Sequence, residues 1–275
     1  MNNLKFSVLM SLYIKEKAEY FDACMQSILH QTVKPDEIVI VLDGPISELL
    51  QEVLDYYRNK LPQLIKIISY PENKGLGYAL SVGVGACSNG LIARMDTDDI
   101  ARKDRFEKQI AMFREHPELD ICGSQIDEFE NGPSNIIARR SVPCTDAEIK
   151  KYQKRRDAFN HMTVMYKRSS VISAGNYLPC PLMEDTYLWV RMIQNGAVCA
   201  NIDEALVYAR IGEDMYERRG TWSYFRKYKE GRKMVRDTGY ISAMDYYVPL
   251  AAQAIVAIVP NGLRGWIFKH ILHRK

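Results

Sequence analysis

The fold is decided by residues 6–43, which read FSVLMSLYIKEKAEYFDACMQSILHQTVKPDEIVIVLD. The apolar runs at residues 6–12 and 38–42 have the length of strands and almost no polar interruption. Such runs are typical of strands that are covered on both faces of a parallel sheet. Between them, apolar side chains recur at helical spacing over residues 21–29, and Pro35 ends the connection. The stretch therefore predicts one β-α-β unit.

The same alternation continues to about residue 115. The expected elements are, in chain order, a helix at residues 47–61, a strand at 65–68, a helix at 76–86, a strand at 91–95 and a helix at 105–114. This order predicts an α/β fold with a doubly wound sheet, in which ligands bind at the carboxyl ends of the strands.

The second half of the chain is less regular. The expected elements are strands at 121–129, 136–142 and 161–166, a helix from Glu184 to the Asn195-Gly196 pair, and a mostly helical part from residue 216 onward. Gly196 follows the last turn of its helix as a C-terminal cap would. We therefore expect a helical C-terminal extension after the sheet.

The composition excludes several classes of protein. Of the 275 residues, 47% are hydrophobic and 26% are charged, which suits a folded domain rather than a disordered chain. The net charge of +3 is too small to favour nucleic acid as the main partner. No apolar run reaches the roughly 18 to 20 residues that span a bilayer, and the first 13 residues lack the features of a signal peptide. Six scattered cysteines without a C-x-x-C pair indicate free thiols in a reducing cytoplasm.

Three carboxylates follow the strand expected at residues 91–95. The sequence there reads Arg94-Met95-Asp96-Thr97-Asp98-Asp99. Carboxylates this close repel one another, and a hard divalent cation such as Mg²⁺ or Mn²⁺ is the usual way to hold them at a strand end. The alternative is that Asp98 or Asp99 caps the following helix and the rest of the turn is solvated. The pattern alone leaves both interpretations open.

Polar residues also follow the second and third strands. Asp43 ends the second strand, where an acidic residue of a nucleotide-binding α/β fold reaches a base or ribose, although it also suits a turn before Gly44 and Pro45. Residues 72–77 open a helix with two glycines, and Lys74 adds a positive charge that suits an anion. Their spacing is neither that of a P-loop nor that of a dinucleotide fingerprint.

Two further acidic residues and a histidine are candidates for acid–base chemistry. Glu184 and Asp185 begin a helix, where capping is the default role for a carboxylate and general base is the functional one. His161 lies in an apolar stretch, where it either orients a substrate hydroxyl or serves a structural role.

Together these motifs resemble the family 2 glycosyltransferases of the GT-A fold. The stretch at 7–13, Asp43, the Asn73-Lys74-Gly75 loop, the Asp96-x-Asp98 pair and Glu184-Asp185 occur in the order and approximate spacing of that family. The resemblance covers roughly residues 4–210. Residues 93–99 and 215–220 look like those of bacterial enzymes that build O-antigen and capsule repeat units.

The resemblance implies a role for each candidate residue. Asp98 would ligate Mn²⁺ or Mg²⁺, and Asp185 would be the catalytic base that takes the proton from the acceptor hydroxyl. Glu184 and His161 would lie in the acceptor region. Asp43 would bind the uracil of the nucleotide-sugar, and Asp96 would lie along its ribose and diphosphate. Arg218 or Arg219 would hold the leaving diphosphate. The remaining residues implied in nucleotide-sugar binding are Ser11, Tyr13, Lys74, Gly75 and Arg94.

Two departures from the family pattern matter. The chain has no Gln-x-x-Arg-Trp, the signature of processive members, which argues for transfer of a single sugar. The His that serves some members as an extra metal ligand is also missing, and Arg210-Ile211-Gly212 stands in that neighbourhood. The resemblance therefore implies a modest affinity for the metal.

The implied activity is inverting transfer of one hexose or N-acetylhexosamine from a UDP-sugar to a lipid-linked saccharide in the synthesis of a bacterial surface polysaccharide, such as O-antigen, capsule or exopolysaccharide. Two alternatives remain. A nucleotidyltransferase shares the sheet and the acidic cluster but usually has a Gly-rich loop after its first strand, unlike residues 11–15 of this chain. A non-catalytic sugar-nucleotide-binding protein keeps the fold and loses the base, which Asp185 argues against.

The expected organisation is a GT-A catalytic domain at residues 1–215 and a helical extension at 216–275. The donor half is expected at about 1–115 and the acceptor half at about 116–215. Residues 263–275 combine apolar side chains at roughly helical spacing with several basic ones, which predicts a helix at the inner face of the cytoplasmic membrane. The alternative for this tail is packing against the domain.

Overall fold

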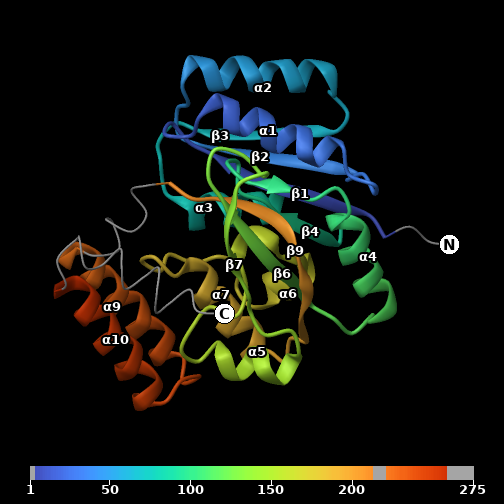
Figure 1. The fold of residues 1–275 in the computed structure, drawn as a ribbon. Helices are drawn as coiled ribbons and strands as arrows, with labels where there is room; N and C mark the ends of the chain where they lie inside the picture. The colour runs from blue at the N-terminus through green and yellow to red at the C-terminus, as the bar shows by residue number, and fades with distance from the viewer. Residues whose placement is uncertain (1–3, 213–220, 259–275) are drawn as a thin grey trace.

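A computed structural model describes residues 4–212 and 221–258 and contains one mixed sheet (Figure 1). The strands follow the order β3-β2-β1-β4-β8-β6-β9-β5, and β7 pairs with β6. They are β1 (Phe6–Leu12), β2 (Glu37–Asp43), β3 (Ile65–Tyr70), β4 (Leu91–Arg94), β5 (Ile100–Ala101), β6 (Ile121–Phe129), β7 (Ile136–Arg140), β8 (Met165–Lys167) and β9 (Cys199–Arg210).

Helices connect and cover these strands. They are α1 (Ala18–Leu29), α2 (Glu48–Lys60), α3 (Leu76–Ala86), α4 (Arg105–Glu115), α5 (Asp146–Tyr152), α6 (Arg168–Ser173), α7 (Glu184–Gln194), α9 (Trp222–Asp237) and α10 (Ala243–Ile258), with a short 3₁₀ turn at His161–Thr163. The sheet prediction for the first half is confirmed, because β3, β2, β1 and β4 are all parallel neighbours.

The two faces of the sheet bury different side chains, because successive residues of a strand point to opposite faces. Along β1, Val8 and Met10 pack against α1, α2 and α4, whereas Leu9 packs against α3 and α7. Figure 1 shows α1 and α2 together on one side of the β1–β3 strands. Helices therefore cover both faces, and the predicted doubly wound α/β fold is confirmed.

Several elements differ from the sequence-based prediction. The helices α5 and α6, the two-residue strand β5 and the long strand β9 were not predicted, and in β9 polar residues interrupt the apolar pattern. The register of β9 against β6 shifts between Ser124 and Ile126. As a result, Asp203 and Glu204 of β9 have no paired residue in β6. The strand predicted at 161–166 is partly wrong, since His161 lies in the 3₁₀ turn and only the end of the segment joins β8.

The C-terminal helices α9 and α10 lie side by side (Figure 1) and pack on α7. Val235 of α9 and Leu250 of α10 form a small core with Val190 of α7. Neither helix, nor any other in the described ranges, combines the length and hydropathy needed to cross a bilayer. The predicted domain boundary at residue 215 and the predicted tail helix at 263–275 lie outside the described residues.

Candidate active site

The parallel strands bring three predicted site residues to one edge of the sheet. Ser11, Asp43 and Arg94 lie at the carboxyl ends of β1, β2 and β4, which are neighbours in the sheet. Tyr13 follows β1 directly and, like Ser11, is half-buried. The carboxyl edge of a parallel sheet is where α/β proteins bind ligands, so these positions suit the predicted role in donor binding.

Asp96, Asp98 and Asp99 form an acidic cluster immediately after β4. One carboxylate oxygen from each lies within 4.8 Å of the others. Burial and the neighbouring carboxylate of Asp96 raise the pKa of Asp98 to about 6, and burial together with Asp98 and Asp96 raises the pKa of Asp99 well above its usual range. A hard divalent cation prefers such all-oxygen ligands and would offset their mutual repulsion, so the residues fit the predicted metal.

Arg94 is the nearest positive charge to this cluster. Its guanidinium forms an ion pair with Asp96 and is only 2% exposed. Its Nε and Nη1 atoms have no hydrogen-bond partner within the described residues. The same charge also lowers the pKa of Asp185 against the stronger effect of burial. Arg94 is therefore paired with the acidic cluster after β4 and also acts on the charge of the predicted base at the start of α7.

Two residues near the acidic cluster were not predicted as site residues. Glu16, in the loop after β1, faces the cluster, and burial with the charges of Asp98 and Asp96 raises its pKa to about 7. Arg210, at the end of β9, donates from its backbone N–H to Asp99 at 2.8 Å and from Nε to the carbonyl of Asp98 at 3.0 Å. Arg210 thus places a cation beside Asp98 and Asp99 of the cluster.

Asp43 is buried and organises the loop before α3. Its Oδ1 accepts hydrogen bonds from the Tyr70 hydroxyl at 2.8 Å and the Lys74 backbone N–H at 2.7 Å. Its Oδ2 accepts from Asn73 Nδ2 at 2.9 Å and the Gly75 backbone N–H at 3.0 Å. These four donors match the acceptor capacity of one carboxylate. A contact with uracil, which stays a prediction, would have to share an oxygen with one of them.

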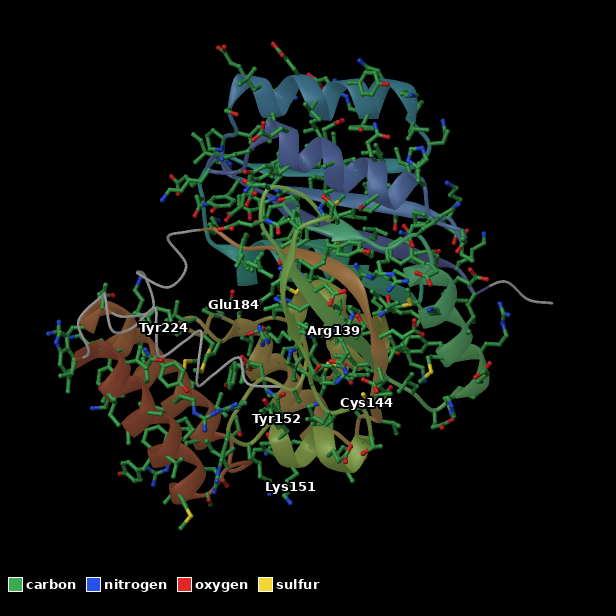
Figure 2. All side chains as sticks on the ribbon, in the orientation of Figure 1. Arg139, Cys144, Lys151, Tyr152, Glu184 and Tyr224 are labelled. Carbon is green, nitrogen blue, oxygen red and sulfur yellow. The ribbon has the colours of Figure 1, made fainter. Side chains whose placement is uncertain are left out.

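The loop that Asp43 holds leads into α3, which is in contact with the start of α7. A Cβ added at Gly77 of α3 would lie 3.1 Å from the Cβ of Glu184, so α3 approaches Glu184 closely. Gly75 caps α3 with a φ of 88°, a left-handed conformation that favours glycine. The exposed Lys74 ammonium lies 4.8 Å from the ring centroid of Tyr78. The helix that follows the predicted donor loop therefore meets the predicted acceptor residue Glu184, labelled in Figure 2.

Asp185 lies beside His161 at the start of α7. Its Oδ2 is 3.8 Å from His161 Nδ1, and its Oδ1 accepts the Thr186 backbone N–H at 2.7 Å. The other ring nitrogen of His161 is 3.0 Å from the Tyr177 hydroxyl. Burial and the charge of Arg94 lower the pKa of His161 well below its usual range, so the ring is neutral at pH 7. The two predicted acceptor-side residues are thus brought together with the predicted base.

Asp157 is a third carboxylate at this end of the site that the sequence did not single out. It lies in the loop after α5 and accepts a hydrogen bond from the Thr186 hydroxyl. Burial, followed by the charges of Asp157 and Glu184, raises the pKa of Asp185 to about 8. Nothing in the sequence around Asp157 marks it, because only the tertiary fold brings that loop to α7.

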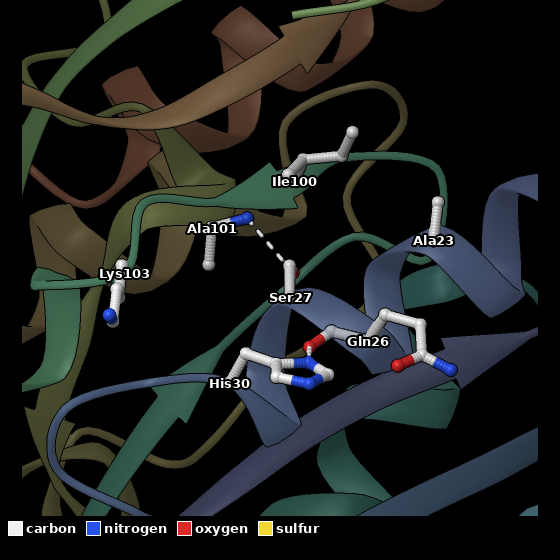
Figure 3. A pocket seen from close by; sticks show the side chains of 7 residues that line it. All are labelled: Ala23, Gln26, Ser27, His30, Ile100, Ala101 and Lys103. Atoms are coloured by element: carbon white, nitrogen blue, oxygen red, sulfur yellow. Dashed lines mark hydrogen bonds between the residues drawn. The ribbon is translucent and has the colours of Figure 1, made fainter.

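Two pockets lie among the described residues, and the second lies next to Asp43, since Leu42, Gly44 and Tyr70 line it. A shallow pocket of about 420 Å³ is lined by α1 and the β5 segment (Figure 3), where the Ala101 N–H donates to Ser27 Oγ. Another, of about 570 Å³, lies beside the ends of β2 and β3. Neither is lined by a predicted site residue. Arg218 and Arg219, the predicted diphosphate ligands, are outside the described residues.

The comparison with protein families gives a match over most of the sheet. The model for glycosyl transferase family 2 matches residues 7–173, which is more than half of the chain.

Two relatives are similar over most of their length. The amylovoran biosynthesis glycosyltransferase AmsE of Erwinia amylovora is 38% identical over 88% of this chain and 91% of the relative. The UDP-Gal:alpha-D-GlcNAc-diphosphoundecaprenol beta-1,3-galactosyltransferase of Escherichia coli is 34% identical over 98% of this chain and 97% of the relative.

A solved structure shares the fold. The mannosyltransferase PcManGT from Pyrobaculum calidifontis, solved in complex with GDP-Man and Mn²⁺, superimposes with a TM-score of 0.63. It covers 95% of this chain and 71% of that protein at 11% sequence identity, so the likeness concerns the fold alone.

Proposed function

This chain belongs to glycosyl transferase family 2, and on that premise we propose that it transfers one hexose or N-acetylhexosamine from a UDP-sugar to a lipid-linked saccharide, with inversion, in bacterial surface polysaccharide synthesis. The observation that carries the proposal is that Arg94, which is ion-paired with Asp96 of the acidic cluster, also lies within electrostatic range of the buried Asp185. A metal-binding group and a base flanking one site are what sugar transfer to a hydroxyl requires.

The choice of substrates is supported by the relatives. The Escherichia coli relative is named for UDP-Gal and for a diphosphoundecaprenol-linked acceptor, and the Erwinia relative for the biosynthesis of amylovoran. Identity of 34% over nearly the whole of both chains supports a sugar donor and acceptor of the same chemical classes. The particular sugar is left to experiment.

On the donor side, Asp96, Asp98 and Asp99 are the residues that would hold Mn²⁺ or Mg²⁺. The cation supplies positive charge that offsets the charge developing on the diphosphate. Arg94 neutralises Asp96, and Arg210 adds a second positive charge beside Asp98. Because these two positive charges partly offset the negative charge of the carboxylates, they support the predicted modest affinity for the metal.

On the acceptor side, Asp185 accepts the proton of the attacking hydroxyl. As the acceptor oxygen bonds to the anomeric carbon, the bond from that carbon to the UDP oxygen breaks on the opposite face. The electron pair leaves with UDP, and the acceptor proton moves to Asp185. His161, held by Tyr177 at Nε2, faces Asp185 with Nδ1, and its lowered pKa makes it a poorer proton acceptor than Asp185.

Both alternatives lose support. Membership of family 2 speaks against a nucleotidyltransferase. The non-catalytic alternative is tested by assay. The purified chain is incubated with a panel of UDP-sugars, Mn²⁺ and a lipid-diphosphate-GlcNAc acceptor, and glycosylated lipid is measured. Product from at least one donor is expected, and release of neither product nor UDP with any donor would contradict the proposal.

Asp43→Asn is expected to raise the KM for the donor by about tenfold or more, with a smaller loss of kcat. In this variant an N–H₂ group would face two hydrogen-bond donors of the 73–75 loop, so hydrogen bonds that hold this loop would be lost. Each hydrogen bond to a charged group contributes about 1.5–3 kcal/mol, which is about a factor of ten or more in donor binding. Initial rates against donor concentration measure the effect. Tyr70→Phe, which removes one donor and leaves the carboxylate, is the matched control with a smaller change. An unchanged KM in Asp43→Asn would contradict the role.

The pH dependence should report Asp185. With its pKa raised to about 8, kcat/KM is expected to rise with pH through about 8, because only the ionised carboxylate accepts a proton. Asp157→Asn keeps an acceptor for Thr186 and removes a negative charge, so this rise should move to lower pH. The other charges facing Asp185 are Glu184, which opposes ionisation, and Arg94, which favours it.

The control for this experiment is Asp237→Asn, which removes an exposed carboxylate of α9. Its profile should match that of the wild type. An unshifted profile in Asp157→Asn would show that the charge of Asp157 does not influence the pKa of Asp185.

The raised pKa of Asp185 also affects folding stability. The free energy of unfolding should fall as pH rises from about 4 to about 8, because Asp185 ionises at lower pH in the unfolded chain than in the folded protein.

A further inference from the structure

Helix α10 presents an apolar stripe that nothing covers within the described residues. Met244, Tyr247, Val248, Ile255 and Ile258 are 66%, 59%, 49%, 61% and 68% exposed. Their spacing, with the exposed Ala251 between them, places all six side chains on one side of a helix. No charged residue interrupts the stripe. Single exposed apolar residues are ordinary on a protein surface, but a continuous stripe marks an interaction site.

The other side of α10 accounts for its intramolecular packing. Tyr246 and Leu250 are buried against Val235 of α9 and Val190 of α7. This arrangement leaves the stripe pointing away from the core. The stripe is therefore not needed to hold α10 on the domain.

A positive charge borders the stripe, and the neighbouring helix is rich in cations. The guanidinium of Arg236 lies 5.8 Å from the ring centroid of Tyr247, a member of the stripe. Residues 221–258 contain six Lys and Arg against three Asp and Glu. The exposed cations of α9 are Arg226, Lys227, Lys229, Lys233 and Arg236. An apolar face with a tyrosine and a cation at its edge, next to a cationic helix, fits the boundary between acyl chains and anionic headgroups.

The length of the stripe decides how it would meet a bilayer. Residues 244–258 span about 21 Å at the helical rise of 1.5 Å per residue, which is too short to cross the hydrocarbon core. A helix of this kind lies in the plane of the interface with its apolar face among the acyl chains.

The hairpin of α9 and α10 is also close to the acceptor side of the site. A Cβ added at Gly231 of α9 would lie 2.5 Å from the carbonyl oxygen of Pro181, so α9 packs tightly on the segment that leads into Glu184. Cys180 in the same segment donates its S–H to the Gly231 carbonyl, with a sulfur–oxygen distance of 3.8 Å. Helix α9, on which α10 packs, therefore lies against the segment that leads into Glu184 and Asp185.

We propose that the stripe of α10 docks on an anionic lipid bilayer, with the cations of α9 at the headgroups. The choice of a bilayer over a second copy of the chain rests on the cations of α9 and on the proposed function, in which the acceptor is lipid-linked. This contact is separate from the one predicted for residues 263–275.

The test is cosedimentation of the full chain with vesicles of phosphatidylcholine alone or with about 30% phosphatidylglycerol at low salt. Ile255→Asp/Ile258→Asp is expected to weaken binding to the anionic vesicles by about tenfold or more, because each change removes buried apolar area. The matched control is Leu49→Asp/Ile137→Asp, which changes exposed apolar residues of α2 and β7 and should bind as the wild type does. Lys229→Gln/Lys233→Gln should weaken binding to anionic vesicles and reduce its salt dependence.

Three results would overturn the proposal. These are equal binding by the Ile255→Asp/Ile258→Asp variant and the wild type, no vesicle binding by the wild type, and a dimer that this variant dissociates while vesicle binding persists. UDP release from donor alone, measured without lipid, should be unchanged in all variants. Vesicle binding that depends on α10 without any sugar transfer would retain the docking surface and reject the proposed function.

Discussion

Replacing Asp98 by Asn is expected to lower kcat/KM for sugar transfer by about 10³-fold or more. The change removes the negative charge from one of three clustered carboxylates and leaves a weaker ligand for a hard cation. Charge stabilisation by a metal contributes several kcal/mol to a transition state, and each 1.36 kcal/mol is a factor of ten. The measurement is the rate of sugar transfer from the UDP-sugar to the acceptor at saturating Mn²⁺.

Chelation provides an independent measurement of the same site. EDTA should inactivate the wild type, and added Mn²⁺ or Mg²⁺ should restore it. Asp237→Asn, the exposed carboxylate change on α9, should behave as the wild type in both conditions. Full activity of the wild type in EDTA would remove the metal from the proposed mechanism.

Asp185→Asn is expected to lower kcat by about 10²-fold or more while the fold and UDP binding survive. Loss of a positioned general base costs about 10²–10⁴-fold. The amide is nearly isosteric and its Oδ1 still accepts the Thr186 backbone N–H, so the start of α7 should be preserved. Single-turnover transfer measures the chemical step, and UDP titration followed calorimetrically measures the binding.

Glu184→Gln is the matched control for the base. Glu184 is adjacent to Asp185 in sequence and packs against Gly77 of α3. If Glu184 only positions the acceptor, its substitution should raise the acceptor KM more than it lowers kcat. Near-normal turnover in Asp185→Asn combined with a large loss in Glu184→Gln would exchange the two roles.

The parallel part of the sheet was predictable because its signal is local. Strands that are buried on both faces read as continuous apolar runs, and the runs at 6–12 and 38–42 form β1 and the main part of β2. The prediction failed where pairing rather than composition makes the strand. In β9, Asp203 and Glu204 break the pattern, and only the shifted pairing with β6 accommodates them.

The family and the carboxylates that follow β2 and β4 were also determined by the sequence alone. Asp43, Asp96 and Asp98 directly follow or end apolar strands, so their place at the carboxyl edge follows from the α/β alternation. The sequence was sufficient to place these carboxylates, because a residue at the end of a strand or in the turn just after it must lie near that edge of the sheet.

Only the tertiary structure decided how charge is arranged around the site. Asp157 meets Asp185 from a loop 28 positions earlier in the chain, and Arg210 meets Asp99 from the end of a strand that the sequence did not reveal. The fold also supplies hydrogen-bond donors to both carboxylate oxygens of Asp43, from Tyr70 at the end of β3 and from residues 73–75 in the loop after it. Burial and distances between remote segments set these interactions, because a pKa depends on what surrounds a group in space and not on its neighbours along the chain.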